Sequence, residues 1–187
     1  MKNKVIMILL ICFLSSCKSS KSISTDDVLG ELGANPHFII DEQPNLRSDL
    51  IDYDPEDITT VTILHSEKAI KRYGEVAKDG AVIIETKAYS TEKYQKRFSE
   101  ISYSYASALS AAGNDEDFIY VVNGILIEGD YLVSDLSSLT DKLIKSISIL
   151  PLNEANVYCI DENKTVVAIN VKKKWAKDED RSWKKIE

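Results

Sequence analysis

Two blocks of the chain repeat the same order of apolar and polar positions. Each opens with a short β-rich run that ends in a turn-forming Asp or Asn, continues with a run of alternating apolar and polar residues, and closes on an apolar run ending in lysine. The runs are residues 36–41, 57–64 and 80–87 in the first block and 117–124, 143–150 and 165–172 in the second. Matching runs are about 82 residues apart at the first and about 85–86 at the later two. The pattern therefore predicts six strands and an internal duplication.

Short helices are predicted between the second and third runs of each block. Ser66 is suited to cap a helix that ends at Gly74. Pro151 is suited to the first position of a helix through residues 152–158. In the first block, residues 54–57 predict a short turn that begins with proline.

Two further helices are predicted from apolar spacing. A helix over residues 90–112 would connect the blocks, and its apolar stripe comprises Tyr94, Phe98, Ile101, Tyr105 and Leu109. Another is predicted over residues 135–143, capped by Ser134. Together the elements predict an α+β fold of two tandem β-α-β units, with short helices packed on small mixed sheets and a helix joining the units.

The first block also carries a family resemblance. It reads Asp57-Ile58 … Val61-Thr62-Ile63-Leu64, then Ala69 … Tyr73-Gly74, then Gly80-Ala81-Val82-Ile83-Ile84-Glu85-Thr86-Lys87. This order resembles the plug domain of TonB-dependent outer-membrane receptors, most closely the Bacteroidota versions. In that family an Ile-x-x-Ile-x-Val-Leu-Lys strand precedes an Ala-x-x-x-Tyr-Gly helix and a Gly-Val-Ile-x-Ile-x-Thr-Lys strand. The resemblance covers residues 36–87 and, more weakly, 117–172, and it implies two plug-like units.

The departures from the family pattern are concentrated at turns. Asp41-Glu42 stands where the family has Asp-Gly, and the second block has Tyr158-Cys159 and Thr165-Val166 where the family has Tyr-Gly and Gly-Val. Cys and Thr lack the easy access of glycine to positive φ, so remodelled turns are expected there. A receptor plug of this family sits inside a large barrel, whereas about fifteen residues follow Lys172. We therefore expect a plug-like fold used without a barrel, which excludes a transporter.

The N-terminal residues predict a signal that targets the chain to a membrane. Lys2 and Lys4 precede an apolar run of about ten residues, and Leu14-Ser15-Ser16-Cys17 follows. Small residues before a cysteine at this place resemble the lipobox of bacterial lipoproteins, which implies lipid modification of Cys17. The alternatives are an ordinary secretory signal with an incidental cysteine and a small membrane anchor. Because Lys18-Ser19-Ser20-Lys21 follows instead of acidic residues, the anchored protein is expected to face the periplasm from the outer membrane.

The organisation expected from these signals has six parts. They are a signal peptide at 1–16, a flexible tether at 17–35, plug-like unit 1 at 36–87, a helical connector at 88–116, a degenerate plug-like unit 2 at 117–172 and a charged tail at 173–187. The tail contains Trp175 and Trp183 and is expected to be solvated, although it could touch a membrane surface or a partner.

Charge narrows the classes of partner. The 187 residues include 23 Lys and Arg against 30 Asp and Glu, a net charge of −7. Loss of residues 1–16 would remove two lysines and no acidic residue, leaving −9. Such a body lacks the clustered cations that nucleic-acid binding needs, and it is repelled by anionic headgroups, which favours a lipid tether over adsorption.

Residues with catalytic or metal-binding chemistry are few. Of three cysteines, Cys12 would leave with the signal and Cys17 would carry lipid, so Cys159 is left alone and is expected to be a small buried residue. His37 and His65 are the candidate general bases. His65 precedes Ser66, but adjacent side chains at a strand-to-helix turn rarely point together. We therefore expect no catalytic, cofactor-binding or metal-ligating residues.

The leading hypothesis is a non-enzymatic lipoprotein of the cell envelope whose plug-like modules bind an envelope protein. The alternative is a small-ligand or glycan binder that uses the tyrosine-rich face around Tyr103 and Tyr105, although core packing is the simpler reading of those rings. A hydrolase of unrecognised type is the third hypothesis. The sequence leaves the partner and the oligomeric state open.

Overall fold

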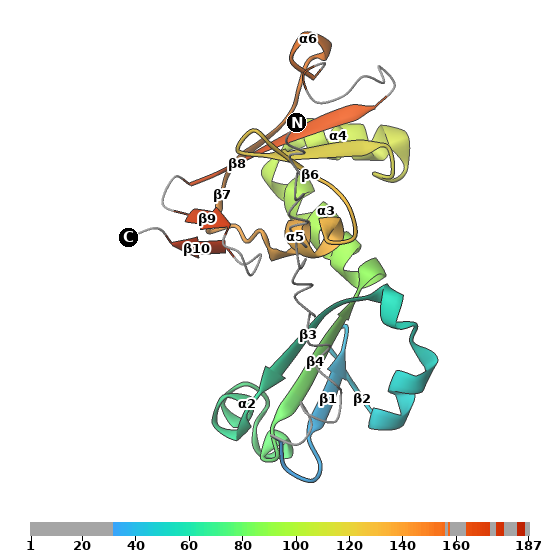
Figure 1. Cartoon of the computed structure of the whole chain (residues 1–187), viewed down its shortest axis with the longest axis vertical. Coiled ribbons are helices and arrows are strands. Elements are labelled where there is room, and N and C mark those ends of the chain that lie inside the picture. Colours follow the sequence, from blue (N-terminus) through green and yellow to red (C-terminus); the bar gives the residue numbers. More distant parts are fainter. Residues whose placement is uncertain (1–31, 156, 158–163, 173–174, 178–182, 186–187) are drawn as a thin grey trace, which may run out of the picture.

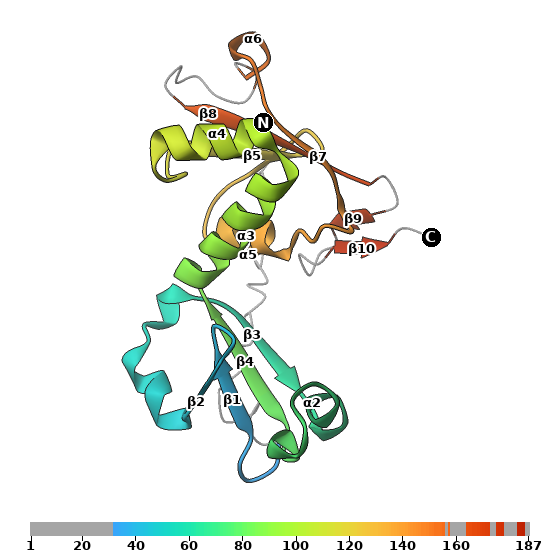
Figure 2. The same ribbon diagram turned by 180° about the vertical axis from the view of Figure 1, so that it is seen from behind.

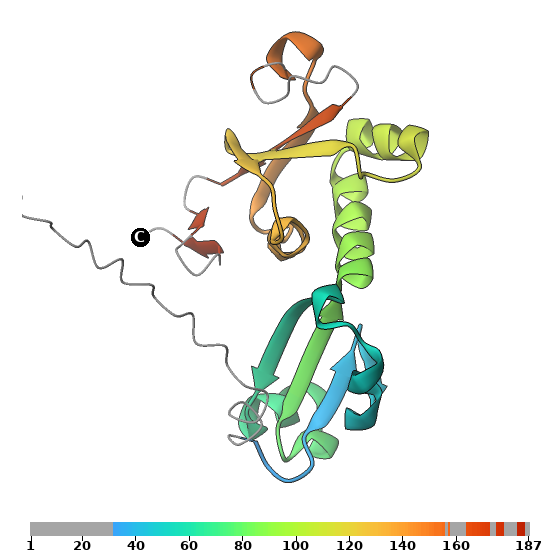
Figure 3. The same ribbon diagram turned by 45° about the vertical axis from the view of Figure 1, so that its right-hand side comes forward.

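The computed structural model describes residues 32–155, 157, 164–172, 175–177 and 183–185 (Figure 1). The expected signal peptide, most of the expected tether, Cys12, Cys17 and Cys159 lie outside these residues. Two small sheets lie at opposite ends of the described structure, and helix α3 (Lys87–Ile101) joins them (Figures 1 and 3). No helix among the described residues is both long and apolar enough to span a bilayer.

Unit 1 is a four-stranded mixed sheet with short helices around it. Its strands are β1 (His37–Ile40), β2 (Gln43–Asn45), β3 (Ile58–Leu64) and β4 (Ala81–Thr86), in the order β2-β1-β4-β3. The β1 and β4 strands are parallel, and the other pairs are antiparallel. The helices are η1 (Arg47–Asp52), η2 (Pro55–Asp57), α2 (Ser66–Tyr73) and η3 (Glu75–Ala77).

Unit 2 has the same topology. Its strands are β5 (Phe118–Val122), β6 (Ile125–Ile127), β7 (Ile144–Ile149) and β8 (Thr165–Val171), in the order β6-β5-β8-β7. Again the inner pair, β5 and β8, is parallel and the outer pairs are antiparallel. The helices are α5 (Leu132–Ser138) and α6 (Leu152–Ala155), and α4 (Tyr103–Ala112) follows α3 before the sheet begins. The α+β fold of two tandem β-α-β units is thus confirmed.

The two units share their strand register as well as their topology. Ile40 pairs with Ile84 in unit 1, and Val122 pairs with Ile169 in unit 2. Val61 pairs with Ile84, and Ile147 with Ile169. The β3–β4 and β7–β8 ladders also shift register at matching places, between Ile58 and Thr60 in unit 1 and between Ile144 and Ser146 in unit 2. These pairs reproduce the offsets expected from the sequence, with 40 matching 122, 61 matching 147 and 84 matching 169.

A side chain at the end of the first strand locks each inner strand pair. In unit 1, Asp41 accepts hydrogen bonds from the Thr86 N–H and the Thr86 hydroxyl, both at 2.8 Å. In unit 2, Asn123 Oδ1 accepts from the Val171 N–H at 2.9 Å. Both residues have positive φ, 49° and 50°, which Asp and Asn tolerate better than most residues. In both turns a side-chain oxygen, of Asp41 in unit 1 and of Asn123 in unit 2, therefore accepts a hydrogen bond from the end of the parallel strand.

From these hydrogen bonds we expect two substitutions of Asp41 to lower the free energy of unfolding by different amounts. Asp41→Asn should lower the free energy of unfolding by less than about 1 kcal/mol, since an amide can still accept from the N–H and donate to the hydroxyl. Asp41→Ala should lower it by about 2–3 kcal/mol, because both hydrogen bonds are lost at a positive φ. Urea unfolding of the two variants measures the difference, and equal losses would contradict the proposed role.

The sheets bury apolar side chains on both faces, but unevenly. In unit 1 one face packs under α2 and η3 around Ile39, Ile83 and Ala69. The other packs under the η1 segment around Phe38 and Ile84. In unit 2 the largest core forms on the face covered by α3, α4 and α5, as seen from behind in Figure 2. It contains Tyr94, Phe98, Tyr105, Phe118, Tyr120, Leu136, Leu139 and Ile169, among others.

The prediction of a single helix over 90–112 was wrong at its centre. The helix breaks at Ser102, where the backbone becomes extended (φ −134°, ψ 113°) and the hydroxyl accepts from the Tyr105 N–H to cap α4. Tyr94, Phe98 and Tyr105 are still buried, as core packing requires, whereas Ile101 turns outward. The connection is therefore two helices that meet at an angle, not one straight stripe (Figure 3).

Other helix boundaries also differ from the predicted ones. The cap of α2 is His65, with Ser66 the first helical residue, and Gly74 ends the helix at φ 81° as expected. Pro151 lies one residue before α6. The α5 helix begins at Leu132, so Ser134 lies inside it and its hydroxyl donates to the Tyr131 carbonyl. Leu139 and Leu143 lie beyond the helix end but are buried.

The sequence pattern missed the three-residue strands and the helices η1 and η3. The β2 and β6 strands each form a hairpin with the strand before them. The expected charged tail likewise contains a short antiparallel pair, β9 (Trp175–Lys177) and β10 (Trp183–Lys185).

Candidate functional site on the connecting helix

The α3 helix is fixed to unit 1 at its first residue. It follows β4 without a loop, and Thr86 is both the last strand residue and the helix cap. The Thr86 hydroxyl accepts from the Tyr89 N–H at 3.2 Å while it donates to Asp41. The direction of α3 is therefore set by the central strand pair of unit 1.

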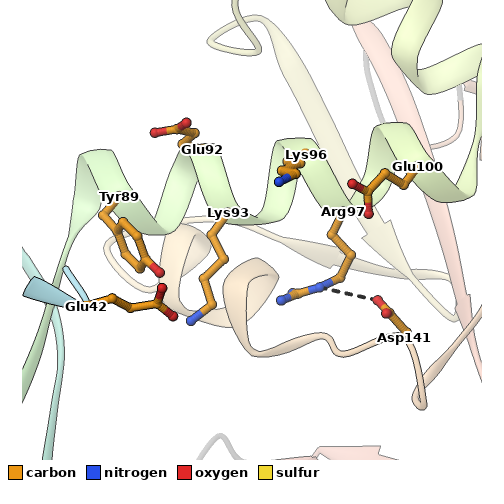
Figure 4. Close-up of a pocket in the computed structure, with 8 residues that line it drawn as sticks. All are labelled: Glu42, Tyr89, Glu92, Lys93, Lys96, Arg97, Glu100 and Asp141. Atoms are coloured by element: carbon orange, nitrogen blue, oxygen red, sulfur yellow. Dashed lines mark ion pairs between the residues drawn. The ribbon is translucent and has the colours of Figure 1, made fainter.

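A polar cleft of about 390 Å³ runs along one side of α3 (Figure 4). Glu42 comes from the β1–β2 turn of unit 1, and Asp141 comes from the segment between α5 and β7 of unit 2. The remaining lining residues are on α3: Tyr89, Glu92, Lys93, Lys96, Arg97 and Glu100. The cleft is thus lined by both units and the helix between them.

The end of the cleft near unit 1 is held by Tyr89 and Lys93. Lys93 Nζ forms an ion pair with Glu85 of β4 and lies 5.6 Å from the centre of the Tyr89 ring. Partial burial, a hydrogen bond to the Glu42 carboxylate and the neighbouring carboxylates raise the pKa of Tyr89 to about 12. Its hydroxyl is therefore a hydrogen-bond donor at any physiological pH.

The end near unit 2 is held by Arg97. Its Nη1 donates to the carbonyls of Ser137 at 3.1 Å and Leu139 at 2.6 Å, and its Nε lies 3.5 Å from Asp141 Oδ1. Those carbonyls lie at the C-terminal end of α5, where a cation is favourable. Figure 4 shows Arg97 and Lys93 extending from the same side of α3.

Three basic and four acidic side chains line the cleft. Two of the basic side chains, Lys93 and Arg97, already form ion pairs with Glu85 and Asp141. Such an arrangement fixes the orientation of α3 against both units. Because each paired charge would have to exchange its partner for a ligand, the cleft is better suited to joining the units than to binding an ion.

A second polar cluster lies at the edge of the large core, around Asp115. Its Oδ2 accepts from the hydroxyls of Tyr94 at 2.6 Å and Tyr120 at 2.5 Å, and its Oδ1 accepts from Gln95 Nε2 at 2.7 Å. The Tyr105 and Tyr120 hydroxyls lie 3.0 Å apart. Burial, the largest cause, and the neighbouring carboxylate raise the pKa of Tyr94 and of Tyr105 well above 10. Burial together with the other two phenols raises the pKa of Tyr120 in the same direction.

The tyrosine-rich face is therefore largely interior. Tyr94, Tyr105 and Tyr120 are buried, whereas Tyr103 is 88% exposed. Asp115 was not identified from the sequence, because its partners Tyr94, Gln95 and Tyr120 come from α3 and β5 and none of them is a neighbour in the local sequence. For the tyrosines of this core, the aromatic spacing of the connecting helix was the signal that could be seen in the sequence.

Neither histidine lines the cleft. His37 opens β1 with its ring edge-on to Tyr73, 5.7 Å between centres, and His65 caps α2. Within the described residues no cluster of three or more His, Cys, Asp or Glu could hold a metal ion. The candidate lipidation residue, Cys17, lies outside them.

Comparison of the chain with family models, with characterised proteins and with solved structures finds no match.

Proposed function

We propose that this protein is a non-enzymatic, lipid-anchored protein of the cell envelope whose two units bind other proteins at the outer membrane, facing the periplasm. The proposal includes descent of both units from a plug-like ancestor. The lipobox resemblance at residues 14–17 supports the anchor. The shared register of the two sheets supports the duplication.

The observation that carries the binding role is the pair of four-stranded sheets, in each of which the outer edge of both outermost strands pairs with no other described strand. Such edges can take up an extended segment of a partner through main-chain hydrogen bonds. The α3 contacts to Glu85 and to the end of α5 hold the two sheets in one arrangement, so a partner could contact both.

The alternative is a small-ligand or glycan binder. Of the two tyrosines proposed for that role, Tyr105 is buried and only Tyr103 is exposed, so such a binder would use the α3 cleft instead. Thermal denaturation of the purified protein with periplasmic ligands separates the two functions, since a ligand that binds the folded state raises the melting temperature with its concentration.

The anchor is tested by one substitution. In a bacterial host that processes lipoproteins, the full chain should incorporate labelled fatty acid and remain with the membranes after a carbonate wash. Cys17→Ser should abolish the label and release the protein into the soluble fraction, because the acyl chains supply the membrane affinity. Cys12→Ser is the matched control and should change neither result. Labelled Cys17→Ser protein would refute the proposed lipid site.

A further inference from the structure

The two units differ in charge at one matching place, the end of the sheet where the two parallel strands finish. Two acidic residues of unit 1 are asparagines in unit 2, and a threonine of unit 1 is a lysine. The matching pairs are Asp41 and Asn123, Glu85 and Asn170, and Thr59 and Lys145. Two negative charges are lost and one positive charge is gained, so this place is more positive by three charges in unit 2.

In unit 1 the acidic side chains at this place are used within the protein. Asp41 accepts hydrogen bonds from Thr86, and Glu85 forms an ion pair with Lys93. Lys93 is available to Glu85 because α3 begins directly at the end of β4. Internal contacts therefore occupy this place in unit 1.

In unit 2 the same place is an open cavity of about 630 Å³. It is lined by Asn123, Lys145, Ser146, Asn170, Val171 and Lys172. None of these lining residues is acidic, and neither lysine forms an ion pair within the part of the chain that the structure describes. In a chain with a net charge of −7, this local excess of positive charge favours an anion as the ligand.

Two hydrogen bonds orient the neutral side chains of the cavity as donors. Asn123 Oδ1 accepts from the Val171 N–H at 2.9 Å, which leaves its Nδ2 to donate to a ligand. Ser146 Oγ accepts from Asn170 Nδ2 at 3.1 Å, which leaves its own hydroxyl proton to donate. The cavity thus offers two ammonium groups, an amide and a hydroxyl as donors.

We propose that this cavity binds a phosphate group, either as the free ion or as the monoester of a larger molecule. A phosphate monoester at neutral pH has about two negative charges and three strong acceptor oxygens, which match two ammonium groups and two neutral donors. A carboxylate has a single charge and two oxygens, so it would use fewer of these donors. Because the polar side chains are exposed, binding should be weak and should fall with added salt. The inference depends neither on the lipid anchor nor on protein binding at the sheet edges.

Titration of the isotopically labelled full chain with inorganic phosphate, at constant ionic strength and neutral pH, tests the site. The side-chain amide signals of Asn123 and Asn170 in proton–nitrogen NMR spectra should shift to saturation, whereas sodium chloride should not shift them.

Two variants install the residues that unit 1 has at this place. Lys145→Thr should raise the dissociation constant for phosphate about fivefold, and Asn170→Glu should raise it further because it adds a negative charge. Lys68→Thr removes an exposed lysine of α2 and is the matched control for net charge, so it should leave the constant unchanged. Unchanged signals away from the cavity show that each variant is folded.

Two further measurements identify the source of the phosphate. Tighter binding of glycerol 3-phosphate than of inorganic phosphate, lost in Lys145→Thr, indicates a soluble ester. Flotation of the Cys17→Ser chain with phosphatidylcholine vesicles only when they contain phosphatidic acid, and only with Lys145 present, indicates a lipid headgroup. If neither occurs, the free ion is the ligand. Signals that shift linearly with phosphate, or a dissociation constant that neither Lys145→Thr nor Asn170→Glu changes, would overturn the site.

Discussion

Asp115→Ala should lower the free energy of unfolding by about 3–5 kcal/mol, the largest loss that we expect from a single polar substitution in this chain. The substitution removes a carboxylate that accepts from Tyr94, Tyr120 and Gln95. Two phenol hydroxyls would then lie in or beside the core with one acceptor fewer. Hydrogen bonds to a charged acceptor contribute about 1.5–3 kcal/mol each, and an unsatisfied buried donor adds a desolvation cost.

Two matched variants make the Asp115 result specific. Asp117→Ala removes an exposed carboxylate two residues away and should change the stability by less than about 0.5 kcal/mol. Asp115→Asn keeps the shape and one acceptor oxygen, so its loss should fall between the other two. Urea unfolding followed by circular dichroism measures all three. Equal stabilities for Asp115→Ala and Asp117→Ala would show that the cluster does not stabilise the fold.

High pH should unfold the protein through the same three tyrosines. The pKa values of Tyr94, Tyr105 and Tyr120 are raised above 10 in the folded state, mainly by burial. A phenol with a raised pKa contributes stability that is fully present below pH 10 and is lost as the pH rises, since the unfolded state releases its proton first. Three such groups would together remove about 4 kcal/mol at pH 11.

The measurement is the free energy of unfolding between pH 8 and pH 11.5, with absorbance at 295 nm to follow tyrosinate. We expect buried tyrosines to ionise together with unfolding rather than before it. Tyr105→Phe keeps the ring and removes one ionisable group, so it should reduce the part of the slope above pH 10 that comes from the three buried tyrosines by about a third; Tyr89, whose pKa is also raised, is unchanged in this variant. Ionisation of all nine tyrosines near pH 10 with the fold intact would contradict the buried cluster.

The strands were predictable from the sequence because their signal is local. Alternation in β3 and β7, and the apolar runs of β4 and β8, indicate buried faces without knowledge of the fold. The sequence offset between the two blocks also predicted which residues would occupy matching positions in the strand pairs of the two sheets. By contrast, Gln43–Asn45 has no apolar pattern, and Ile125–Ile127 is too short to be distinguished from a loop.

The site was harder to predict because its contacts join distant residues. The apolar stripe continues across Ser102, so periodicity does not reveal the helix break there. Ser102 itself was the available signal, as serine is a favoured cap. Nothing in the local sequence distinguishes Arg97 from its neighbours Lys93 and Lys96. Its role depends on the carbonyl groups of Ser137 and Leu139, about forty positions away.

The direct passage from β4 into α3 limits how this chain can change over evolution. One added residue between Thr86 and Tyr94 would rotate the rest of the helix by about 100°, which would turn Tyr94 and Phe98 away from the interior they fill. Insertions and deletions should therefore be absent from this stretch in any descendant that keeps the fold.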